Sequence, residues 1–391
     1  MKPMKNKKIA FLINSLTSGG AERVLSIILN ELKVQGYNIE LICLEKNNFY
    51  NINKDIKITY LSESNGKGNS IIKLLSIPLL AYKLKQYIKT NNIEIIQSHI
   101  YRANFINAIA KLLGSKHKLQ MVNAGQVSMY KTKGLIGKVN LFLIHTLYPI
   151  ADIIICKSKG MEVDLQSHFK KDLNTTIINN PYDINKIESI YDEEIDNFKF
   201  QENKIYILYV GRFASFKKPE YIINSLKNLN NNIELILLGD GPKKEDLITL
   251  SKDLELKDRI HFLGRVSNPY KFMKKANIFI LSSDDGEGFP NVLAEAMICK
   301  VPVISTDCKS GPREILSPNS NINIQLKDTM EVTDKGILVP IANIDKMTEA
   351  INLINEDKEL QDTFKNNAYR RSKDFSLESI IKKYTKALNY E

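Results

Sequence analysis

The chain has 391 residues, of which 43% are hydrophobic and 25% charged. These proportions are ordinary for a soluble globular protein and exclude disordered and fibrous classes, while the length predicts two domains of ordinary size. The net charge of +11 is unevenly placed: residues 1–188 carry 26 Lys and Arg against 13 Asp and Glu, whereas residues 189–391 carry 29 against 31. A basic first half predicts a nucleic acid or an anionic membrane surface as its partner.

Four cysteines are scattered along the chain without a C-x-x-C pair. This pattern predicts reduced thiols in a cytoplasmic protein. No window offers the roughly 20 apolar residues that a membrane-spanning helix needs. The basic N-terminus runs into an early strand rather than into the apolar core of a signal peptide. We therefore expect neither secretion nor membrane crossing.

The first half alternates apolar, strand-like runs with helical stretches. The expected segments are strand 8–13, loop 14–20, helix 21–35, and strands 38–44, 93–98 and 153–156. Such alternation predicts parallel strands joined by crossover helices. After residue 183 the chain turns polar and acidic, which places a domain boundary near residue 185.

The second half repeats the alternation after this boundary. Its expected strands are 205–210, 233–238, 260–262, 278–281 and 301–305, each followed by a turn marked by Gly or Pro. We predict an α/β fold with two doubly wound, Rossmann-like domains, 1–185 and 186–375, that face each other across a cleft. Ligands of such folds bind beyond the carboxyl ends of the strands, so the turns there are the candidate sites.

The turn after the strand at 278–281 carries the most informative motif. In Glu287-Gly288-Phe289-Pro290-Asn291-Val292-Leu293-Ala294-Glu295, two carboxylates flank a sharp turn that opens a helix. Pro290 suits the first helical position, so Glu295 is expected about two turns into the helix. The N–H groups near Asn291, Val292 and Leu293 would then face an anion such as a diphosphate. The alternative is that Glu287 only caps the helix and Glu295 is a solvated surface residue.

The loop after the strand at 205–210 is basic. Gly211-Arg212-Phe213-Ala214-Ser215-Phe216-Lys217-Lys218-Pro219 combines the planar fork of an arginine with the point charge of a lysine. Together they can neutralise a diphosphate without a metal, although solvated surface residues fit this loop taken alone. Two glycine corners follow the next strands, at 239–242 and 262–266. The first favours a conformational role, and the backbone of the second either pairs with a base or only ends a strand.

His99 lies just past a strand of the first half, in Ser98-His99-Ile100-Tyr101-Arg102-Ala103-Asn104. A lone histidine is more often structural, but a position at the carboxyl end of a strand favours a functional role.

Two segments of the first half, 70–85 and 130–143, mix Lys with Leu, Ile and aromatic residues, as interfacial membrane segments do. Core helices with a Lys-rich solvated face fit each segment equally well. No signature of a nucleic-acid-binding module is present, so we expect no nucleic-acid partner and favour an anionic membrane surface.

The sequence motifs of several other kinds of functional site are absent. Gly19-Gly20-Ala21-Glu22-Arg23 is not the dinucleotide fingerprint G-x-G-x-x-G, and neither a Walker sequence nor a G-x-S-x-G elbow occurs. Asp284, Asp285 and Glu287 suggest a metal, yet they form no D-x-D pair and no His or Cys cluster adjoins them. We expect no metal and no other cofactor.

Taken in order, the motifs resemble the retaining glycosyltransferases of family four, which have the GT-B fold. The resemblance spans almost the whole chain. It rests on the Gly-Gly loop, His99, the Gly-Arg-Phe loop with Lys217, the corners at 239–242 and 262–264, the Glu287 and Glu295 pair, and Thr306-Asp307-Cys308-Lys309-Ser310-Gly311-Pro312-Arg313-Glu314.

Two further features refine the resemblance. The last stretch, 376–391, is similar to the terminal helix that crosses back onto the first domain in this family. Ser310-Gly311-Pro312-Arg313 replaces the commoner Gly-Gly turn, and it is similar to variants in enzymes that build bacterial surface polysaccharides.

The resemblance implies a role for each site residue. Arg212 and Lys217 would hold the donor diphosphate, although Lys218 beside Lys217 leaves open which lysine does so. Glu287 and the backbone after it would hold the donor sugar, and His99 would contact that sugar from the first domain. Glu295 would bind the ribose hydroxyls. The remaining implied contacts are Gly19, Gly20 and Val266 with the donor, and Tyr101, Arg102 and Asn104 on the acceptor side.

The implied reaction moves a sugar from a nucleotide donor, a UDP-sugar, to a hydroxyl of a lipid-linked glycan, with retention of the anomeric configuration and without a metal. It would take place on the inner face of the cell membrane, with the protein cytoplasmic and peripheral. Alternatives are a GT-B nucleotide-sugar epimerase or hydrolase, which would turn over the donor without an acceptor, and a non-catalytic glycan-binding module, which would show no turnover.

Overall fold

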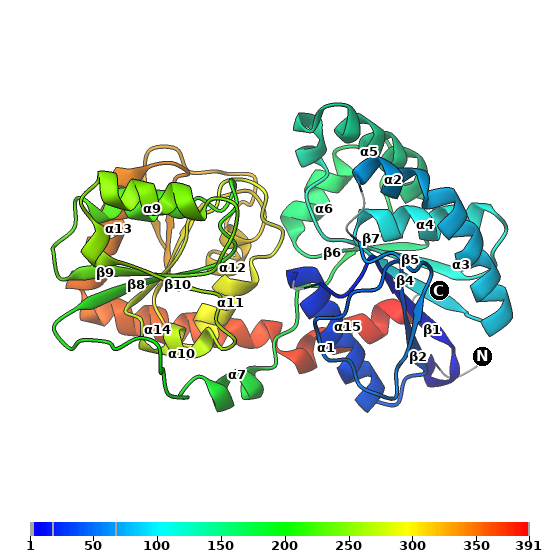
Figure 1. Cartoon of the computed structure of the whole chain (residues 1–391), viewed down its shortest axis with the longest axis horizontal. Helices are drawn as coiled ribbons and strands as arrows, with labels where there is room; N and C mark the ends of the chain where they lie inside the picture. The colour runs from blue at the N-terminus through cyan, green and yellow to red at the C-terminus, as the bar shows by residue number, and fades with distance from the viewer. Residues whose placement is uncertain (1–3, 18, 67–68, 390–391) are drawn as a thin grey trace. The chain divides into compact units, whose positions relative to one another are not determined.

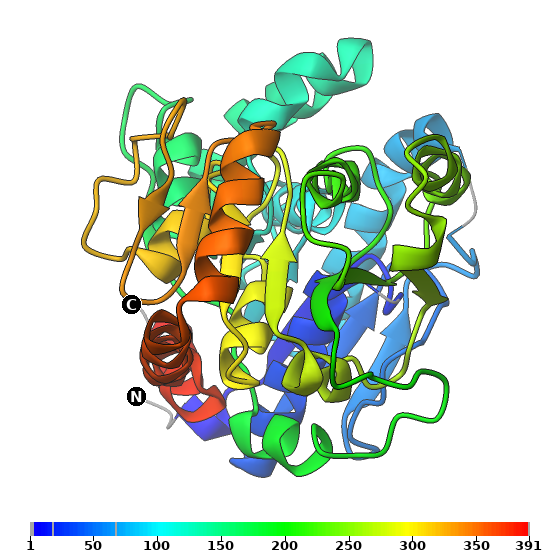
Figure 2. The same cartoon turned by 90° about the vertical axis from the view of Figure 1, so that its left-hand side faces the viewer.

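A computed structural model describes residues 4–17, 19–66 and 69–389 and divides the chain into two compact units (Figures 1 and 2). The first unit comprises Met1–Pro181 with Glu378–Glu391, and the second comprises Tyr182–Leu377. Each unit is described by itself below. The predicted α/β class with two doubly wound sheets is confirmed.

The first unit is built on a seven-stranded parallel sheet. Its strand order is β3-β2-β1-β4-β5-β6-β7. The strands are β1 (Ile9–Ile13), β2 (Ile39–Cys43), β3 (Lys57–Tyr60), β4 (Ile95–His99), β5 (Lys118–Asn123), β6 (Ile153–Cys156) and β7 (Thr175–Ile177). The helices are α1 (Gly20–Val34), α2 (Ser70–Leu75), α3 (Ile77–Asn91), α4 (Tyr101–Leu112), α5 (Gly134–Leu147), α6 (Lys159–Gln166) and the C-terminal α15 (Leu377–Leu388), with 3-10 turns at Met4–Asn6, Ser128–Thr132 and Tyr148–Ile150.

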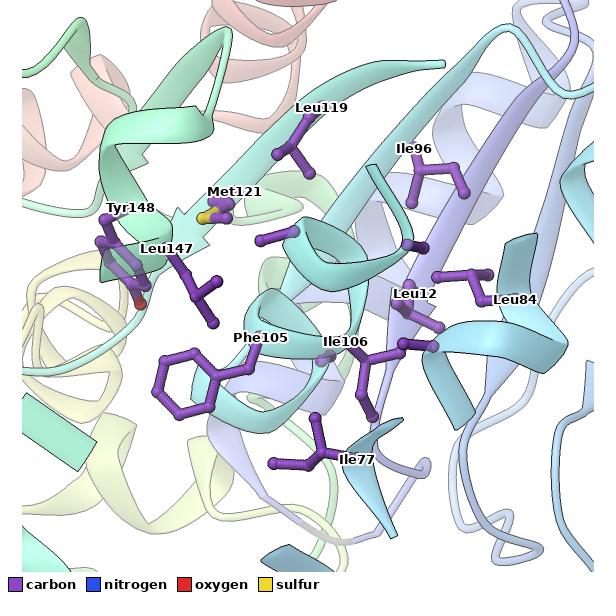
Figure 3. Packing of buried hydrophobic residues seen from close by; sticks show 14 of the residues in the cluster. Leu12, Ile77, Leu84, Ile96, Phe105, Ile106, Leu119, Met121, Leu147 and Tyr148 are labelled. Atoms are coloured by element: carbon purple, nitrogen blue, oxygen red, sulfur yellow. The ribbon is translucent and has the colours of Figure 1, made fainter. Parts of the chain in front are cut away.

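The core of this unit lies between the sheet and helices α3, α4 and α5. Figure 3 shows Phe105 and Ile106 of α4 among side chains of β1, β4 and β5. Burying each such side chain contributes about 1.5–3 kcal/mol. Alternate strand residues point to the other face, where Gln120 of β5 donates to the Ala387 carbonyl of α15. The C-terminal helix is therefore part of the first unit.

The second unit has a seven-stranded sheet of the order β10-β9-β8-β11-β12-β14-β13, parallel except for the pair β13 and β14. Its strands are β8 (Ile205–Val210), β9 (Ile233–Leu238), β10 (Ile260–Gly264), β11 (Ile278–Leu281), β12 (Val303–Thr306), β13 (Glu331–Val332) and β14 (Ile337–Val339). Its helices are α7 (Ile184–Ile190), α8 (Pro219–Leu226), α9 (Lys244–Asp253), α10 (Tyr270–Lys275), α11 (Asn291–Ile298), α12 (Pro312–Leu316), α13 (Ile344–Glu356) and α14 (Lys358–Ser372), with 3-10 turns at Lys257–Arg259 and Lys373–Phe375.

Helices cover both faces of this second sheet. Side chains of α10 and α11 pack on one face, and those of α8, α9 and α13 pack on the other. A strand that is buried on both faces has a continuous run of apolar residues. The bounds of β8, β9 and β11 were therefore predicted correctly from sequence. Strands β3, β5, β7, β13 and β14 were not predicted: β3 and β5 mix polar residues with apolar ones, and the other three have only two or three residues. The four cysteines are buried thiols without a disulfide.

Candidate active site

The second sheet reverses its strand order between β8 and β11. These neighbours pair in parallel, and their carboxyl ends open into the loops 211–218 and 282–290. Successive connections leave such a point in opposite directions, and ligands of doubly wound folds bind in the crevice that results. The basic loop and the Glu287 turn, more than sixty residues apart, therefore start from adjacent strands.

Lys217 and Glu287 join these two loops. The Lys217 Nζ lies 2.5 Å from Glu287 Oε1, and the Ser283 hydroxyl donates to the same oxygen at 2.5 Å. Ser282 Oγ donates to the Lys217 carbonyl at 3.0 Å and fixes the backbone of the loop. Glu287 is buried, and a carboxylate out of water requires charged or hydroxyl donors of this kind. A carboxylate that only capped the helix would not need this ion pair, so the contact with Lys217 speaks against that alternative.

Lys218 takes a different direction from Lys217. Its φ of +48° is left-handed, at the N-cap of α8, and its Nζ lies 3.5 Å from Glu220 and 3.6 Å from Asp284. The two lysines thus pair with different carboxylates. Because only Lys217 is paired with Glu287, the geometry favours Lys217 for the role that the sequence left open.

The Arg212 side chain is exposed at the start of the same loop. Its carbonyl accepts from the Ala214 N–H at 2.8 Å, which shapes the backbone while the guanidinium stays at the surface. The loop packs tightly on the corner after β9, where a Cβ at Gly239 would lie 1.9 Å from the Gly211 carbonyl. A Cβ at Gly241 would lie 2.5 Å from the Phe213 carbonyl. These close approaches support the conformational role expected for the 239–242 corner.

The turn into α11 differs in two details from its prediction. Pro290 is the N-cap, with φ −69° and ψ 104°, and the first helical residue is Asn291. Glu295 therefore lies about one turn into the helix rather than two. The Leu293 N–H is not free for an anion, because it donates to the Pro290 carbonyl at 3.2 Å. An anion contact of the backbone at Asn291 and Val292 stays a prediction.

Glu295 is 1% exposed, which rules out the solvated surface role for this carboxylate. Tyr270 Oη donates to Glu295 Oε1 over 3.4 Å, a long bond. On the same unit, Val266 follows β10 and packs partly buried against the core that includes Leu293.

The 310–313 loop supports the Glu287 turn from outside. Ser310 Oγ donates to the Gly288 carbonyl at 2.9 Å, and a Cβ at Gly311 would lie 2.4 Å from Pro290 Cδ. Gly311 has φ of +99°, so both its conformation and its close contact call for glycine. The Phe289 ring is buried edge-on against Phe375, with ring centroids 5.0 Å apart. The turn is thus fixed on both sides.

The two aspartates beside Glu287 have structural partners. Asp284 Oδ1 accepts from Tyr221 Oη at 2.8 Å, and Asp285 Oδ1 accepts from the Lys309 N–H at 2.7 Å. In the ranges 4–17, 19–66 and 69–389, no group of three or more His, Cys, Asp and Glu side chains is placed to hold a metal ion.

The first sheet reverses its strand order between β1 and β4. Gly19 and Gly20 follow β1, and His99 ends the adjacent strand β4. Gly19 is the N-cap of α1, its carbonyl accepts from Tyr50 Oη at 3.1 Å, and Gly20 is the first helical residue. His99 ends β4, is 2% exposed and lies 3.2 Å through Nε2 from Gln97 Oε1. Burial, and then the charge of Lys157, lower the pKa of His99 well below its ordinary value. His99 is therefore a neutral imidazole.

The residues expected on the acceptor side are held by the protein itself. Tyr101 Oη donates to the Gly125 carbonyl at 2.7 Å. Arg102 Nη1 lies 2.5 Å from Glu45 Oε1, and its Nη2 donates to Ser76 Oγ at 3.0 Å. Asn104 is fully buried, and its amide donates to the core groups Val122 O and Tyr148 Oη. An acceptor contact of Asn104 stays a prediction, and its side chain would have to become accessible for it.

Sequence reasoning missed the polar residues that hold the site from within. Ser283 binds Glu287, and Gln97 binds His99. Gln97 interrupts an apolar run that is otherwise typical of a buried strand, which is the signal that could have identified it. Lys157, after the Ile-rich strand β6, carries the same signal.

Comparison with known proteins places the two units in one enzyme family. The family described as "Glycosyl transferases group 1" matches residues 191–371, and "Glycosyltransferase Family 4" matches residues 18–186. A Campylobacter jejuni protein, N-acetylgalactosamine-N,N'-diacetylbacillosaminyl-diphospho-undecaprenol 4-alpha-N-acetylgalactosaminyltransferase, is 32% identical over 98% of this chain and 99% of its own length.

Two further similarities agree with this assignment. A second C. jejuni protein, GalNAc-alpha-(1->4)-GalNAc-alpha-(1->3)-diNAcBac-PP-undecaprenol alpha-1,4-N-acetyl-D-galactosaminyltransferase, is 25% identical over 97% of this chain and 98% of its own length. The crystal structure of Anabaena Alr3699/HepE in complex with UDP has a TM-score of 0.77 at 19% identity, covering 98% of this chain and 100% of that one, which shows the fold alone. The chain belongs to the glycosyltransferases of family four and has their GT-B fold.

Proposed function

We propose that this glycosyltransferase moves a sugar from a UDP-sugar to a hydroxyl of a lipid-linked glycan and retains the anomeric configuration. The observation that carries the proposal is the arrangement after β8 and β11, where Arg212, the Lys217–Glu287 pair and the start of α11 share one edge of the sheet. The relatives support the choice of substrates, since two C. jejuni proteins are named as transferases that act on undecaprenol-linked glycans and the Anabaena protein binds UDP.

The reaction needs charge stabilisation at the leaving group. The bond between the anomeric carbon and the diphosphate oxygen breaks, and a bond to the acceptor oxygen forms on the same face of the sugar. The acceptor proton passes to the departing phosphate. Arg212, Lys217 and the backbone N–H groups at the start of α11 stabilise the negative charge that grows there, and removing one such contact typically costs about 3 kcal/mol. Glu287 keeps Lys217 in place and faces the sugar.

We propose that this chemistry requires no metal. An arginine and a lysine supply the positive charge that a divalent ion provides in other sites. Excess chelator should leave the transfer rate unchanged. Loss of activity with EDTA and its recovery with Mn²⁺ or Mg²⁺ would assign a metal to Asp284, Asp285 or Glu287 and reject this part of the proposal.

The transfer itself is tested with purified protein, a panel of UDP-sugars and an undecaprenyl-diphosphate-linked glycan. We expect UDP release that depends on the acceptor, together with an elongated lipid whose new linkage keeps the donor's anomeric configuration by NMR. UDP release without an acceptor would indicate a hydrolase, and donor isomerisation an epimerase. Absence of turnover with every donor would favour the glycan-binding module.

We further propose that the first unit binds reversibly to an anionic membrane surface, where a lipid-linked acceptor is found. None of the described helices is long and apolar enough to cross a bilayer. The two lysine-rich segments form α2, α3, the turn at Ser128–Thr132 and α5. Each also presents large apolar side chains that are more than half exposed, namely Ile71, Ile72, Leu75, Leu79 and Tyr82 in one, and Leu135, Ile136 and Phe142 in the other.

These exposed apolar groups favour a membrane over a merely solvated face. Lys83, Lys131, Lys133 and Lys138 are exposed among them, which complements anionic headgroups. Each basic residue near such a surface contributes about 1 kcal/mol, and salt screens the attraction. Core helices with a polar outer face would not expose so many Leu, Ile and aromatic side chains.

Vesicle flotation tests this surface. We expect retention on anionic vesicles and not on neutral ones, weakened by high salt and by changing Lys83, Lys85, Lys131 and Lys133 to Glu. A matched control changes Lys227, Lys252, Lys257 and Lys358 of the second unit, all exposed, to Glu. Equal loss in both quadruple variants, or retention that ignores lipid charge, would reject the surface.

A further inference from the structure

His99 is the end of a chain of buried hydrogen bonds that the reaction outlined above does not use. Gln97 and His99 are two residues apart on β4, so their side chains share a face of the sheet. His99 Nε2 lies 3.2 Å from Gln97 Oε1, and Gln97 Nε2 lies 3.0 Å from Gln120 Oε1 on β5. Gln120 Nε2 lies 2.8 Å from the Ala387 carbonyl of α15.

The direction of this chain follows from its last member. A backbone carbonyl can only accept, so Gln120 must present its NH₂ to Ala387. Its own carbonyl oxygen then accepts from the Gln97 NH₂, and the Gln97 oxygen is left facing His99. The His99 Nε2 must therefore carry a hydrogen. Ala387 is the penultimate residue of α15, where helix carbonyls have no partner within the helix, so it is available to accept from Gln120.

The surroundings keep the ring neutral. His99 is 2% exposed, and both glutamines are fully buried. Lys157, after β6, adds to the effect of burial on the pKa of His99, although burial lowers the pKa of Lys157 itself to about 7. Its Nζ donates to Tyr384 Oη of α15 and lies 4.9 Å from the centre of that ring. The Phe11 ring of β1 lies 6.2 Å from the His99 ring, centroid to centroid. A neutral ring with a hydrogen on Nε2 has a lone pair on Nδ1.

We propose that Gln97 and Gln120 are positioning residues that fix His99 as the Nε2–H tautomer, through a hydrogen-bond chain that ends on the Ala387 carbonyl of the C-terminal helix. His99 Nδ1 is then an acceptor at the carboxyl end of β4. This inference rests on the proposed function for its consequence, because an acceptor there suits a hydroxyl of the bound sugar and does not supply a proton. The tautomer itself does not depend on that function.

The first measurement is on the unchanged protein and needs no substrate. Long-range ¹H–¹⁵N NMR of the full chain, with ¹⁵N-labelled histidine at neutral pH, distinguishes the two neutral tautomers. The sequence has five histidines, so a His99→Gln variant assigns the signals of this ring. We expect the Nε2–H pattern. An Nδ1–H pattern or an imidazolium would overturn the proposal, whatever becomes of any variant.

Two variants with a matched control test the chain. Gln97→Met and Gln120→Met keep the side-chain volume but remove the amide, so the His99 signals should move toward a mixture of tautomers. The control is Ser115→Ala, because Ser115 Oγ lies 3.0 Å from Nδ1 of His117, another buried histidine of this unit. It should move the His117 signals and leave those of His99. His99 signals that move only in Ser115→Ala, or in none of the three, would reject the positioning role.

Kinetics give an independent readout. With a working transfer assay, Gln97→Met should lower turnover about tenfold and leave the KM for the donor nearly unchanged. Unchanged turnover in a Gln97→Met protein whose His99 signals have moved would refute a role of the tautomer in the reaction. If the wild-type protein transfers no sugar, the proposed function fails while the NMR result still decides whether the hydrogen-bond chain sets the tautomer.

Discussion

The two sheets reverse their strand order at the same relative place, yet the groups gathered there differ in chemistry. At the edge of the second unit, Lys217 and Glu287 form an ion pair, and Arg212 is exposed beside them. At the edge of the first unit, His99 is buried and neutral and is held by the amide of Gln97. The same topology therefore holds an ion pair at the end of β8 and β11 and a neutral imidazole at the end of β4.

The difference follows from what surrounds each edge. Burying an isolated charge costs several kcal/mol, so ions persist in the second unit because each has an opposite charge or open solvent. The first unit buries its histidine and places Lys157 near it, and both lower the pKa of His99, which favours the neutral form. We infer that the second unit supplies the charge stabilisation of a leaving diphosphate, and that the first unit supplies hydrogen bonds to neutral hydroxyl groups.

The largest effect is expected where the charged edge is broken. Lys217→Ala should lower turnover about 100-fold to 1,000-fold, because a donor aimed at developing charge is worth roughly 3–4 kcal/mol. Lys218→Ala, the matched control next to it, should lose much less, since Lys218 pairs with Glu220 and Asp284. Steady-state kinetics and thermal unfolding of both variants are the measurement. Equal and severe loss in the two, or a fully active Lys217→Ala, would contradict the assignment.

The buried histidines of the first unit predict that its free energy of unfolding depends on pH. His117 is buried between Ser115 and Asn107, and burial, then the charge of Lys111, lower its pKa to about 4. The unfolded chain, with an ordinary histidine pKa near 6.5, binds a proton in this window that the folded protein does not. The contribution of His117 to the free energy of unfolding should therefore fall by about 3 kcal/mol as the pH drops from 6.5 toward 4.

Urea midpoints from pH 7.5 to 4.5 check this prediction. His117→Gln should have a shallower pH dependence than the wild-type protein, and the lowered pKa of His99 should leave a residual slope in the same direction. The control lies in the second unit, where His261 Nε2 is 2.7 Å from Glu234. His261→Gln should not flatten the curve in the way that His117→Gln does. Parallel curves for wild-type and His117→Gln would disprove the assignment.

The sequence predicted strand bounds best where hydrophobic burial alone determines the strand. Strands β6, β8, β9 and β11 are apolar runs whose bounds were predicted correctly, because both faces are buried. Strand β5 was missed, since Gln120 and Asn123 look like loop residues until their burial is known. Periodicity cannot show that a polar side chain has a partner on another strand.

The site was predicted in part for the same reason. Glu287 and Lys217 were identified as a pair of motifs, but their direct contact depends on β8 and β11 being neighbours. The preference for Lys217 over Lys218 as the diphosphate ligand depends on the left-handed backbone of Lys218, which the sequence does not show. The burial of Asn104 was not predicted, because it is a property of the packed helix α4 rather than of its neighbours in sequence.

A smaller effect is expected at the buried carboxylate of α11. Glu295→Gln should raise the KM for the donor about tenfold to 100-fold with less change in kcat, because a hydrogen bond to a charged group contributes about 1.5–3 kcal/mol. Tyr270→Phe, which removes the 3.4 Å bond to Glu295, should have a weaker effect. Donor titrations at saturating acceptor measure both. A Glu295→Gln enzyme with unchanged KM would remove Glu295 from the nucleotide site.

The smallest effect concerns a backbone position at the edge of the second sheet. Gly264, at the end of β10, has φ of +71°, and a Cβ there would meet no atom within 4 Å. Gly36 of the first unit has φ of +82° and equally open space, so it is a matched control far from any proposed site. Each Gly→Ala change should lower the free energy of unfolding by about 1 kcal/mol, the cost of a left-handed conformation with a side chain.

The comparison of Gly264 with Gly36 distinguishes a purely conformational role of Gly264 from a contact with the donor. If the 262–266 segment only ends a strand, Gly264→Ala and Gly36→Ala should have similar urea midpoints and the same KM for the donor as the wild-type protein. We expect this outcome, because the corner is open at Gly264 and the strain is local. A KM raised in Gly264→Ala alone would show instead that the backbone at Gly264 approaches the donor closely, as pairing with a base requires, and would extend the nucleotide site to the end of β10.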